Sequence, residues 1–519
     1  MKLYRSIMTV SGFTALSRVL GFTRDMLIAA VLGAGAVSDA FFVAFRLPNL
    51  FRSLFAEGAF NAAFIPLFTR RMKEGGLDMA RRFAEEALAV LLTALLILSI
   101  LAEIAMPWLV TLIAPGFVDN PEKFDLAVLL TRITFPYLLC MSLTALAAGM
   151  LNAMGRFAAA AAAPVILNVI AISALILAAS FGLHNRPEAA MILAWAVCVA
   201  GFAQLALLAF MARRHGMDLR FRLPRLTPGV KRLFRLAGPG VLTAGITQIN
   251  LLIGTMIASL QAGAVSYIYY ADRINQLPLG IVGIAIGVVL LPELSTKLSS
   301  GDGKSAMFSH NRALEFALLL TLPAAAALCI VPTPIIQVLF ERGAFTAGDT
   351  AAVSAALTAF ALGLPAFVMI KVFQPGFFAR EDTRTPMYYA GASAVVNIAG
   401  SLSLFFWLGH VGIAIATSLA AWTNATLLGV TLIRRGHFEP DANLKKRGAM
   451  IALASVIMAV ALWAATFPLA GLFEPSNGVL VQIFALLGLV GGGALVYLVM
   501  AQLTGALSAR SLLNAVRRG

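Results

Sequence analysis

Arginines inside long apolar segments are the residues of this sequence best suited to chemistry. Arg18 and Arg24 lie in one such segment, Arg52 in the next, and Arg273 in the second half of the chain. An arginine at the centre of a bilayer costs about 2.5–3.5 kcal/mol, which makes several of them a functional signal. Because the planar guanidinium fork fits phosphate oxygens, the sequence predicts a cationic cavity for an anionic ligand that carries phosphate.

Other polar side chains share helix faces with the first two arginines. Ser17 and Arg24 are seven residues apart, as are Arg18 and Asp25, and this spacing places each pair on one face. Arg18 and Arg24 lie about 120° apart around an ideal helix. We therefore expect a bend at Gly21 that lets both guanidinium groups face one cavity, with Asp25 holding Arg18.

The second apolar segment continues the pattern. Asn49 and Arg52, three residues apart, share one face, and Asp39 and Arg46, seven apart, share another. Glu57 follows near the end of the segment.

Any single arginine could have a structural role in place of a ligand-binding one. Its side chain would then pack between helices or extend to the lipid headgroups. This alternative fits Arg46, Arg132 and Lys371, which lie near the ends of segments. Packing or snorkelling fits Arg18, Arg24 and Arg52 less well, because two successive helices carry several arginines.

Composition indicates which elements must position these residues. Of 519 residues, 60% are hydrophobic and 12% are charged, against about 25% charged in soluble domains, so a soluble enzyme is excluded. Apolar runs long enough to span a bilayer recur along the chain, without the alternating pattern of an outer-membrane barrel. We predict an all-α polytopic membrane protein with 14 transmembrane helices at residues 7–32, 36–66, 84–106, 127–152, 161–182, 191–212, 236–261, 267–294, 313–332, 351–376, 387–406, 411–433, 448–468 and 479–503.

The net charge of +15 is explained mainly by topology. With the N-terminus inside, 29 of the 39 basic residues fall in inner segments, as the positive-inside rule requires. Both termini are therefore expected in the cytoplasm, and no nucleic-acid partner is expected. The outer segments hold only Lys123, Arg186 and Arg342.

The chain also repeats itself. The pentapeptide AGAVS occurs at 34–38 and at 262–266, an offset of 228, and Pro136 pairs with Pro365 at an offset of 229, as Asn168 does with Asn397. Six helices per repeat give both copies the same orientation, which is a transporter plan in which two lobes rock around a site. We expect an N-terminal lobe at 1–225, a C-terminal lobe at 226–440, and two appended helices at 441–519.

Metal chemistry has little support in the sequence. Cys140, Cys198 and Cys329 are far apart within predicted helices, and the five histidines fall in loops. No metal site and no cofactor are expected.

Several longer motifs include charged positions inside the predicted spans. They are SRVLGFTRD at 17–25, SDAFFVAF at 38–45, LPNLFR at 47–52, FAEGAF at 55–60, APGF at 114–117, ITFPY at 133–137 and YYADR at 269–273. Together these motifs resemble the MurJ (MviN) lipid II flippase family, which belongs to the multidrug/oligosaccharidyl-lipid/polysaccharide exporter superfamily. The likeness extends over essentially the whole chain.

The resemblance implies a fold and a function. The fold would be two MATE-like six-helix lobes plus two C-terminal helices that form a groove for a lipid tail. The protein would be a transporter, not an enzyme, that moves lipid II, the undecaprenyl-pyrophosphate-linked peptidoglycan precursor, to the outer leaflet of the bacterial cytoplasmic membrane. It would work by alternating access, and its substrate-binding residues would be Arg18, Arg24, Arg52, Arg273, Asn49 and Ser17, with Asp25, Asp39 and Glu57 as orienting or gating residues.

Energy coupling is open at this stage. Some members of the family hold sodium with acidic residues of the second lobe, but the spans here offer Gln248, Asn250, Asn397, Thr417 and Asn424 without a mid-span carboxylate. We therefore predict no sodium site and expect the membrane potential to bias the cycle.

Three other classes compete with the flippase hypothesis. A drug or cation exporter of the superfamily would want acidic or aromatic cavity residues. An exporter of another polyprenyl-linked oligosaccharide would share the fold and an anionic lipid ligand, and only the motifs disfavour it. An enzyme acting on polyprenyl phosphates would need clustered carboxylates and Mg²⁺, whereas the carboxylates here are scattered.

Overall fold

The computed structural model describes residues 2–52 and 59–507. These residues form helices and no strand, which confirms the predicted all-α class. Ten helical segments are long and apolar enough to cross a bilayer. The other expected spans fall on the helices Lys2–Leu32, Ala36–Arg52, Pro228–Ala258 and Ala264–Ser299, which are not among those ten, so the number 14 remains a prediction.

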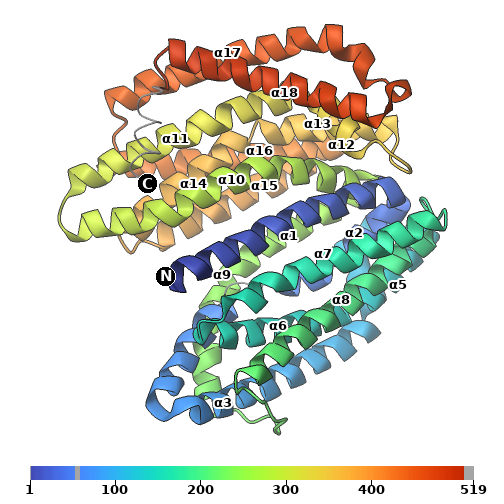
Figure 1. Cartoon of the computed structure of the whole chain (residues 1–519), viewed down its shortest axis with the longest axis vertical. Coiled ribbons are helices and arrows are strands. Elements are labelled where there is room, and N and C mark those ends of the chain that lie inside the picture. The colour runs from blue at the N-terminus through green and yellow to red at the C-terminus, as the bar shows by residue number, and fades with distance from the viewer. Residues whose placement is uncertain (1, 53–58, 508–519) are drawn as a thin grey trace. The chain divides into compact units, whose positions relative to one another are not determined.

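The chain divides into two compact units (Figure 1). The first holds residues 1–266 and 342–346, and the second holds 267–341 and 347–519. The helices of the first unit are α1 Lys2–Leu32, α2 Ala36–Arg52, α3 Ala59–Ile104, α4 Met106–Ile113, α5 Pro121–Thr134, α6 Pro136–Ala153, α7 Phe157–Ser180, α8 Pro187–Arg214 and α9 Pro228–Ala258.

The second unit follows with its own set of helices, although the first turn of α10 counts with the first unit. They are α10 Ala264–Ser299, α11 Gly303–Ile330, α12 Pro332–Phe340, α13 Ala347–Ala361, α14 Leu364–Phe378, α15 Arg384–Leu408, α16 His410–Arg434, α17 Ala442–Leu469 and α18 Gly478–Leu503.

Prolines and polar caps set many helix starts. Proline occupies the first turn of α5, α6, α8 and α9, where its missing N–H is not needed. Asn120, Thr227, Asp302 and Asp441 each accept a hydrogen bond from a backbone N–H of the following first turn, as N-cap residues do.

The two halves break their helices at equivalent places. The expected span 127–152 is interrupted at Phe135, before Pro136, and the expected span 351–376 is interrupted at Gly363, before Pro365. The short helices α4 and α12 also occupy equivalent positions and were not predicted. These breaks follow the repeat offset found in the sequence.

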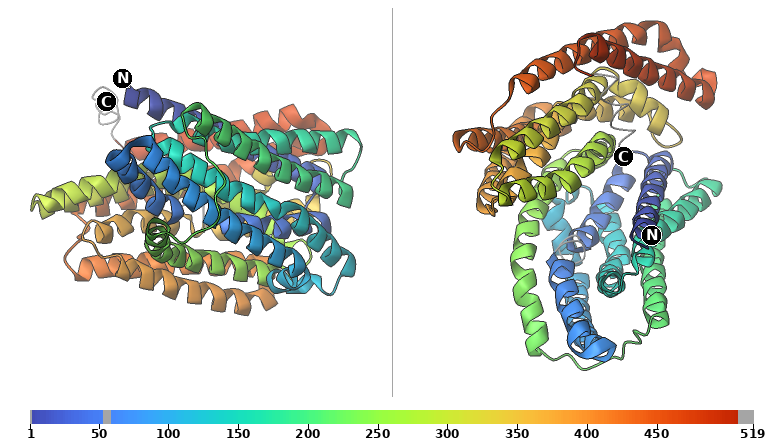
Figure 2. Two further views of the ribbon diagram at one scale, coloured as in Figure 1. Left: turned by 90° about the horizontal axis from the view of Figure 1, so that it is seen from below. Right: turned by 60° about the vertical axis from the view of Figure 1, so that its left-hand side comes forward.

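Within the first unit, α1 packs on α7, α7 on α8, and α3 on both α6 and α9. Helix α9 runs alongside α3 (Figure 2), and its contacts place it with the first unit, whereas the sequence repeat assigns it to the second lobe. Helix α3 reverses direction at Gly75 and Gly76, where the backbone leaves helical angles.

Within the second unit, α15 pairs with α16, and α14 packs against both α11 and α16. Apolar side chains of α10, α11, α14 and α16 share one buried core. Helices α17 and α18 lie side by side along α11 (Figure 1), and they bury a separate core against α11 and α12.

Candidate functional site

Arg24 of α1 is anchored by three side-chain hydrogen bonds. Its Nε and Nη2 donate to Asp25 Oδ1 at 3.1 and 2.8 Å, and its Nη1 donates to Oδ1 of Asn168 on α7 at 3.0 Å. The Asp25 side chain is 3% exposed and the Arg24 side chain 13%. A buried carboxylate therefore fixes the guanidinium plane on a membrane helix.

Asn168 connects Arg24 to Ser17. Its side-chain Nδ2 donates a hydrogen bond to the Ser17 carbonyl oxygen at 2.9 Å, and its Oδ1 accepts the hydrogen bond from Arg24 Nη1. Asn168 was not among the predicted site residues. The available signal was its repeat partner Asn397, since a polar side chain kept at one place in two membrane repeats needs a reason.

The prediction that Asp25 holds Arg18 was wrong. Asp25 pairs with Arg24, whereas Arg18 is exposed and forms no ion pair with it. Seven residues separate Arg18 from Asp25 along the helix, a rise of about 10 Å, while the Arg24 guanidinium reaches its chain neighbour directly. Helix α1 runs without interruption from Lys2 to Leu32, and Gly21 lies against the Asn168 side chain.

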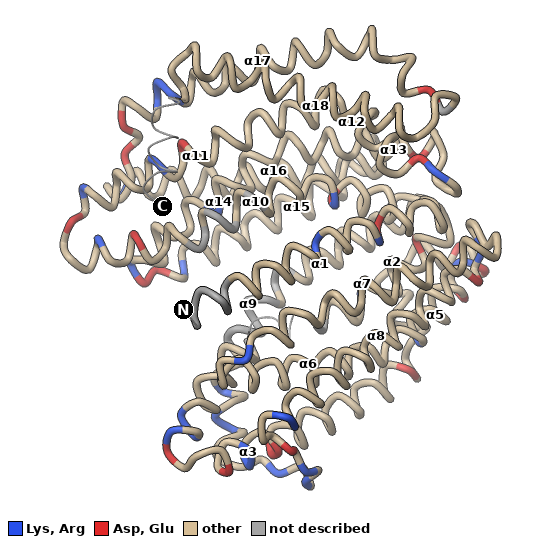
Figure 3. The backbone as a smooth tube through the Cα atoms, viewed as in Figure 1, with Lys and Arg blue, Asp and Glu red and all other residues tan. Residues whose placement is uncertain are grey.

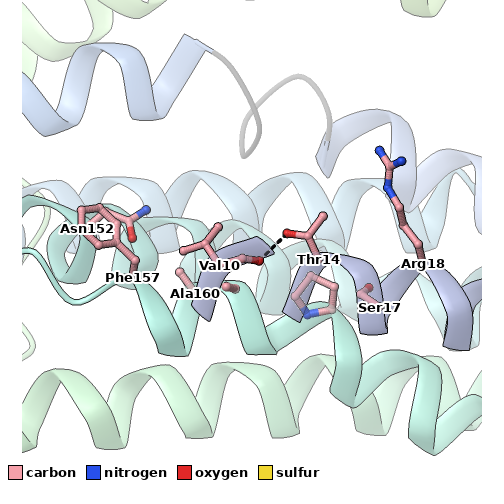
Figure 4. A pocket seen from close by; sticks show the side chains of 9 residues that line it. Val10, Thr14, Ser17, Arg18, Asn152, Phe157 and Ala160 are labelled. Carbon is pink, nitrogen blue, oxygen red and sulfur yellow. Dashed lines mark hydrogen bonds between the residues drawn. The ribbon is translucent and has the colours of Figure 1, made fainter. Parts of the chain in front are cut away.

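Ser17 and Arg18 line a pocket of about 290 Å³ between α1 and the ends of α6 and α7 (Figure 4). The Arg18 guanidinium extends away from the other labelled side chains, and Thr14 donates to the Val10 carbonyl oxygen at 2.8 Å. Apart from Arg18, the lining offers only hydroxyl and amide groups and apolar carbon; it consists of Val10, Thr14, Ser17, Arg18, Asn152, Phe157, Ala160, Ala161 and Pro164.

Asp39, at the start of α2, is fully buried. Its Oδ2 lies 2.7 Å from Nζ of Lys123 on α5 and accepts the backbone N–H of Gly263 at 2.9 Å. Its Oδ1 accepts both the backbone N–H and the hydroxyl of Ser266, at 2.9 and 2.7 Å. One carboxylate therefore joins α2, α5 and the first turn of α10, where backbone N–H groups have no helical partner.

Lys123 was predicted as a loop residue and proves to be buried in this cluster. Asn120 caps α5 by accepting the Lys123 backbone N–H at 3.1 Å, which puts the lysine in the first helical turn. Its ammonium also lies 3.9 Å from the centre of the Phe117 ring. The capping sequence Asn-Pro-Glu-Lys was the signal that could have placed Lys123 on a helix.

The remaining predicted residues of α2 are less closely defined. Asn49 is half-buried, and Arg46 donates to the Leu251 carbonyl oxygen of α9 at 3.2 Å. Arg52 ends α2, and its side chain lies outside the described part of the structure. Glu57 also lies outside the described residues.

Arg273 belongs to α10 in the second unit. Its Nη2 donates to the Tyr269 hydroxyl at 2.9 Å, one turn earlier, and its guanidinium lies 4.9 Å from that ring. The tyrosine thus orients Arg273 by a hydrogen bond and a cation–π contact. That Arg273 shares a cavity with the arginines of α1 remains a prediction.

Charged residues gather at the helix ends, and few lie along the helices (Figure 3). Among the described residues, no group of three or more His, Cys, Asp or Glu side chains is arranged to hold a metal ion.

Two of the polar residues considered for a sodium site contact one another in the second unit. The Thr417 hydroxyl donates a hydrogen bond to Asn397 Oδ1 at 3.2 Å.

The arrangement of helices has counterparts among solved transporters. An inward-facing multidrug transporter of the MATE family superposes with a TM-score of 0.65 at 15% identity, covering 82% of this chain and 97% of the other. The structure titled "Lipid II flippase MurJ, inward closed conformation" superposes with a TM-score of 0.78 at 26% identity, covering 98% of this chain and 100% of the other. The chain is therefore a multi-pass helical membrane protein with a MATE-like fold.

Sequence comparisons narrow this class. Residues 28–487 match the family described as "Lipid II flippase MurJ". A probable lipid II flippase MurJ from Rhizobium meliloti (strain 1021) is 50% identical, covering all of this chain and 97% of the relative. One from Rhizobium tropici is 52% identical over 88% of this chain and 86% of the relative. The chain belongs to the lipid II flippase MurJ family.

Proposed function

We propose that this protein is a transporter that moves lipid II from the inner to the outer leaflet of the bacterial cytoplasmic membrane for peptidoglycan synthesis. Membership of the MurJ family over nearly the whole chain carries the proposal. The anchored guanidinium of Arg24 supplies a matching chemistry, because arginine recognises phosphate oxygens through paired N–H donors.

The pyrophosphate of the lipid would bind to Arg18, Arg24, Arg52 and Arg273. Asp25 and Asn168 hold Arg24 in a fixed orientation before any ligand arrives, so little side-chain entropy is lost on binding. Ser17 and Asn49 would contact the sugar or peptide part. Glu57 would act at a gate.

Asp39 is proposed as an outer latch. It holds the first turn of α10 against α2 and α5 through Gly263, Ser266 and Lys123. Release of these bonds would free α10 to move away from α2. In alternating access, such a latch closes the outer side while the site is open to the inner leaflet.

The lobes of the transport cycle would comprise residues 1–225 and 226–440, with 441–519 appended. The appended helices α17 and α18 would guide the polyprenyl tail. Between residues 448 and 503 the only charged residue is Glu474. Large apolar side chains on both helices are exposed, among them Trp463, Phe467 and Phe484.

The membrane potential would reset the empty carrier. Moving one positive charge through the membrane is worth about 2.3 kcal/mol per 100 mV, and an inside-negative potential draws a cationic cavity inward. No sodium site is part of the proposal. Both termini would be cytoplasmic, since the basic loops between spans then lie inside.

The decisive experiment is reconstitution of the purified protein in liposomes that contain lipid II, with an imposed inside-negative potential. We expect lipid II to reach the opposite leaflet faster than in protein-free liposomes, and faster with the potential than without it. A matched liposome with a different polyprenyl-pyrophosphate oligosaccharide tests the competing exporter function. Equal transport of both lipids, or depletion in cells without inner-leaflet accumulation of lipid II, would contradict the proposal.

A further inference from the structure

The connector between α8 and α9, residues 215–227, is held against α3 although it has no regular secondary structure. Met217 is 1% exposed. The Arg220 backbone N–H donates to Glu85 Oε1 at 3.1 Å, and Arg222 Nε donates to Glu85 Oε2 at 2.5 Å. Because Glu85 itself is 1% exposed, this ion pair fixes the path of the connector.

The C-terminal end of the connector is fixed as well, since the Thr227 hydroxyl donates to Glu86 at 2.7 Å. Between these attachments, apolar side chains project from the protein. Phe221 is 83% exposed, Leu223 78% and Leu226 61%. Their exposure therefore does not result from a loose backbone.

Basic residues surround these apolar side chains. Residues 213–235 contain eight basic side chains and one acidic side chain, Asp218. The basic residues are Arg213, Arg214, Arg220, Arg222, Arg225, Lys231, Arg232 and Arg235, and all eight are exposed.

We propose that residues 215–227, which we name the basic strap, bind anionic phospholipid headgroups at the membrane surface, with Phe221 and Leu223 inserted at the headgroup level. The strap directly follows the end of α8, a helix long and apolar enough to cross a bilayer, so its first residues are expected close to the membrane surface. Exposed aromatic and aliphatic side chains flanked by cations are the pattern of interfacial membrane binding. The excess of positive charge selects anionic lipid over zwitterionic lipid.

The test places an environment-sensitive fluorophore on Phe221→Cys in the full-length protein, with the three native cysteines replaced by alanine. The protein is reconstituted in phosphatidylcholine vesicles with or without phosphatidylglycerol. We expect a blue-shifted emission and stronger quenching by headgroup-region nitroxide lipids when phosphatidylglycerol is present. High salt should reduce the difference, because the attraction is screened.

The matched control carries the label on Asp218→Cys, an exposed polar position of the same strap, and should show little quenching in either lipid. Replacing Arg220 and Arg225 with glutamine should remove the effect of phosphatidylglycerol, while Arg222 still anchors the strap to Glu85. A Phe221 label that remains accessible to aqueous iodide in both lipids overturns the proposal. So does a label shielded only in native membranes, which would indicate a protein partner.

Discussion

The side-chain hydroxyls of Ser38 and Ser266 lie 2.9 Å apart and share a hydrogen bond, and these serines occupy the same position in the two copies of AGAVS. A two-fold rotation that exchanges the copies would also exchange the serines. Residues that contact their own equivalents lie beside the axis of such a rotation. The two copies of the pentapeptide therefore meet at Asp39, which also accepts the Ser266 hydroxyl.

The first prediction concerns this cluster. Asp39→Asn removes the carboxylate that compensates Lys123, whose side chain is 7% exposed. Breaking a buried ion pair in this way costs about 3–5 kcal/mol, so we expect a lower melting temperature for the purified variant. Adding Lys123→Met should recover part of the loss, because no uncompensated ammonium then remains buried. An unchanged melting temperature for Asp39→Asn would remove the structural basis of the proposed latch.

The second prediction concerns Arg24. Arg24→Ala should abolish growth complementation in cells depleted of the native protein, and Arg24→Lys should restore it only in part, because lysine keeps the charge without the planar fork. Arg70→Ala is the matched control, since Arg70 forms an exposed ion pair with Glu74. Full complementation by Arg24→Ala, with normal protein levels, would refute the assignment of Arg24 to the substrate cavity.

The third prediction concerns Asn168. Asn168→Ala removes the acceptor for Arg24 and the donor to the Ser17 carbonyl, and a hydrogen bond to a charged group is worth about 1.5–3 kcal/mol. We expect reduced lipid II transport in liposomes, with a smaller loss than for Arg24→Ala. Asn397→Ala, the repeat equivalent, serves as the control. Equal effects of the two asparagine variants on transport would show that Asn168 has no special link to Arg24.

The fourth prediction concerns how the stability of the fold depends on pH through Asp382, which lies between two of the expected spans. Asp382 follows α14, and its carboxylate accepts the hydroxyl and the backbone N–H of Thr385 and pairs with Arg435. These bonds, the Thr385 hydroxyl first among them, lower the pKa of Asp382 to about 2. A lowered carboxyl pKa stabilises the folded state above the unfolded pKa of about 3.9, and this contribution is lost as pH falls toward about 2.

We therefore expect Asp382→Asn to lower the melting temperature at neutral pH, by an amount equivalent to about 1 kcal/mol or less because solvent screens a partly exposed pair. The difference from the wild type should shrink as pH decreases from about 4 toward about 2. Arg435→Gln should have a smaller effect, since the bonds from Thr385 remain. A difference that stays constant down to low pH would exclude the carboxylate as its source.

Apolar run length and charge bias were sufficient to predict the helical class, because lipid leaves the backbone few alternatives. The repeat offset also placed Pro136 and Pro365, where the paired helices break. Short helices such as Met106–Ile113 escaped prediction, because a run of eight residues carries no span signal.

Side-chain partners were harder to predict than helices. Periodicity on one helix placed Asp25 with Arg18, but it says nothing of Asn168 on α7 or of how far a guanidinium reaches. The same holds for Asp39 and Lys123, which are 84 residues apart in sequence. Such pairs depend on how the helices pack against one another, and the periodicity of a single sequence gives no information about that packing.

The Asp39 cluster also constrains how far the two halves can resemble one another. Position 267 is the repeat counterpart of Asp39, and it holds a tyrosine. Two identical halves would bring a second carboxylate next to Ser266, beside the first, and like charges in one buried site repel. With Tyr267 in place of a second aspartate, the Asp39 carboxylate bonds to Ser266 without a like charge from the other copy of the repeat.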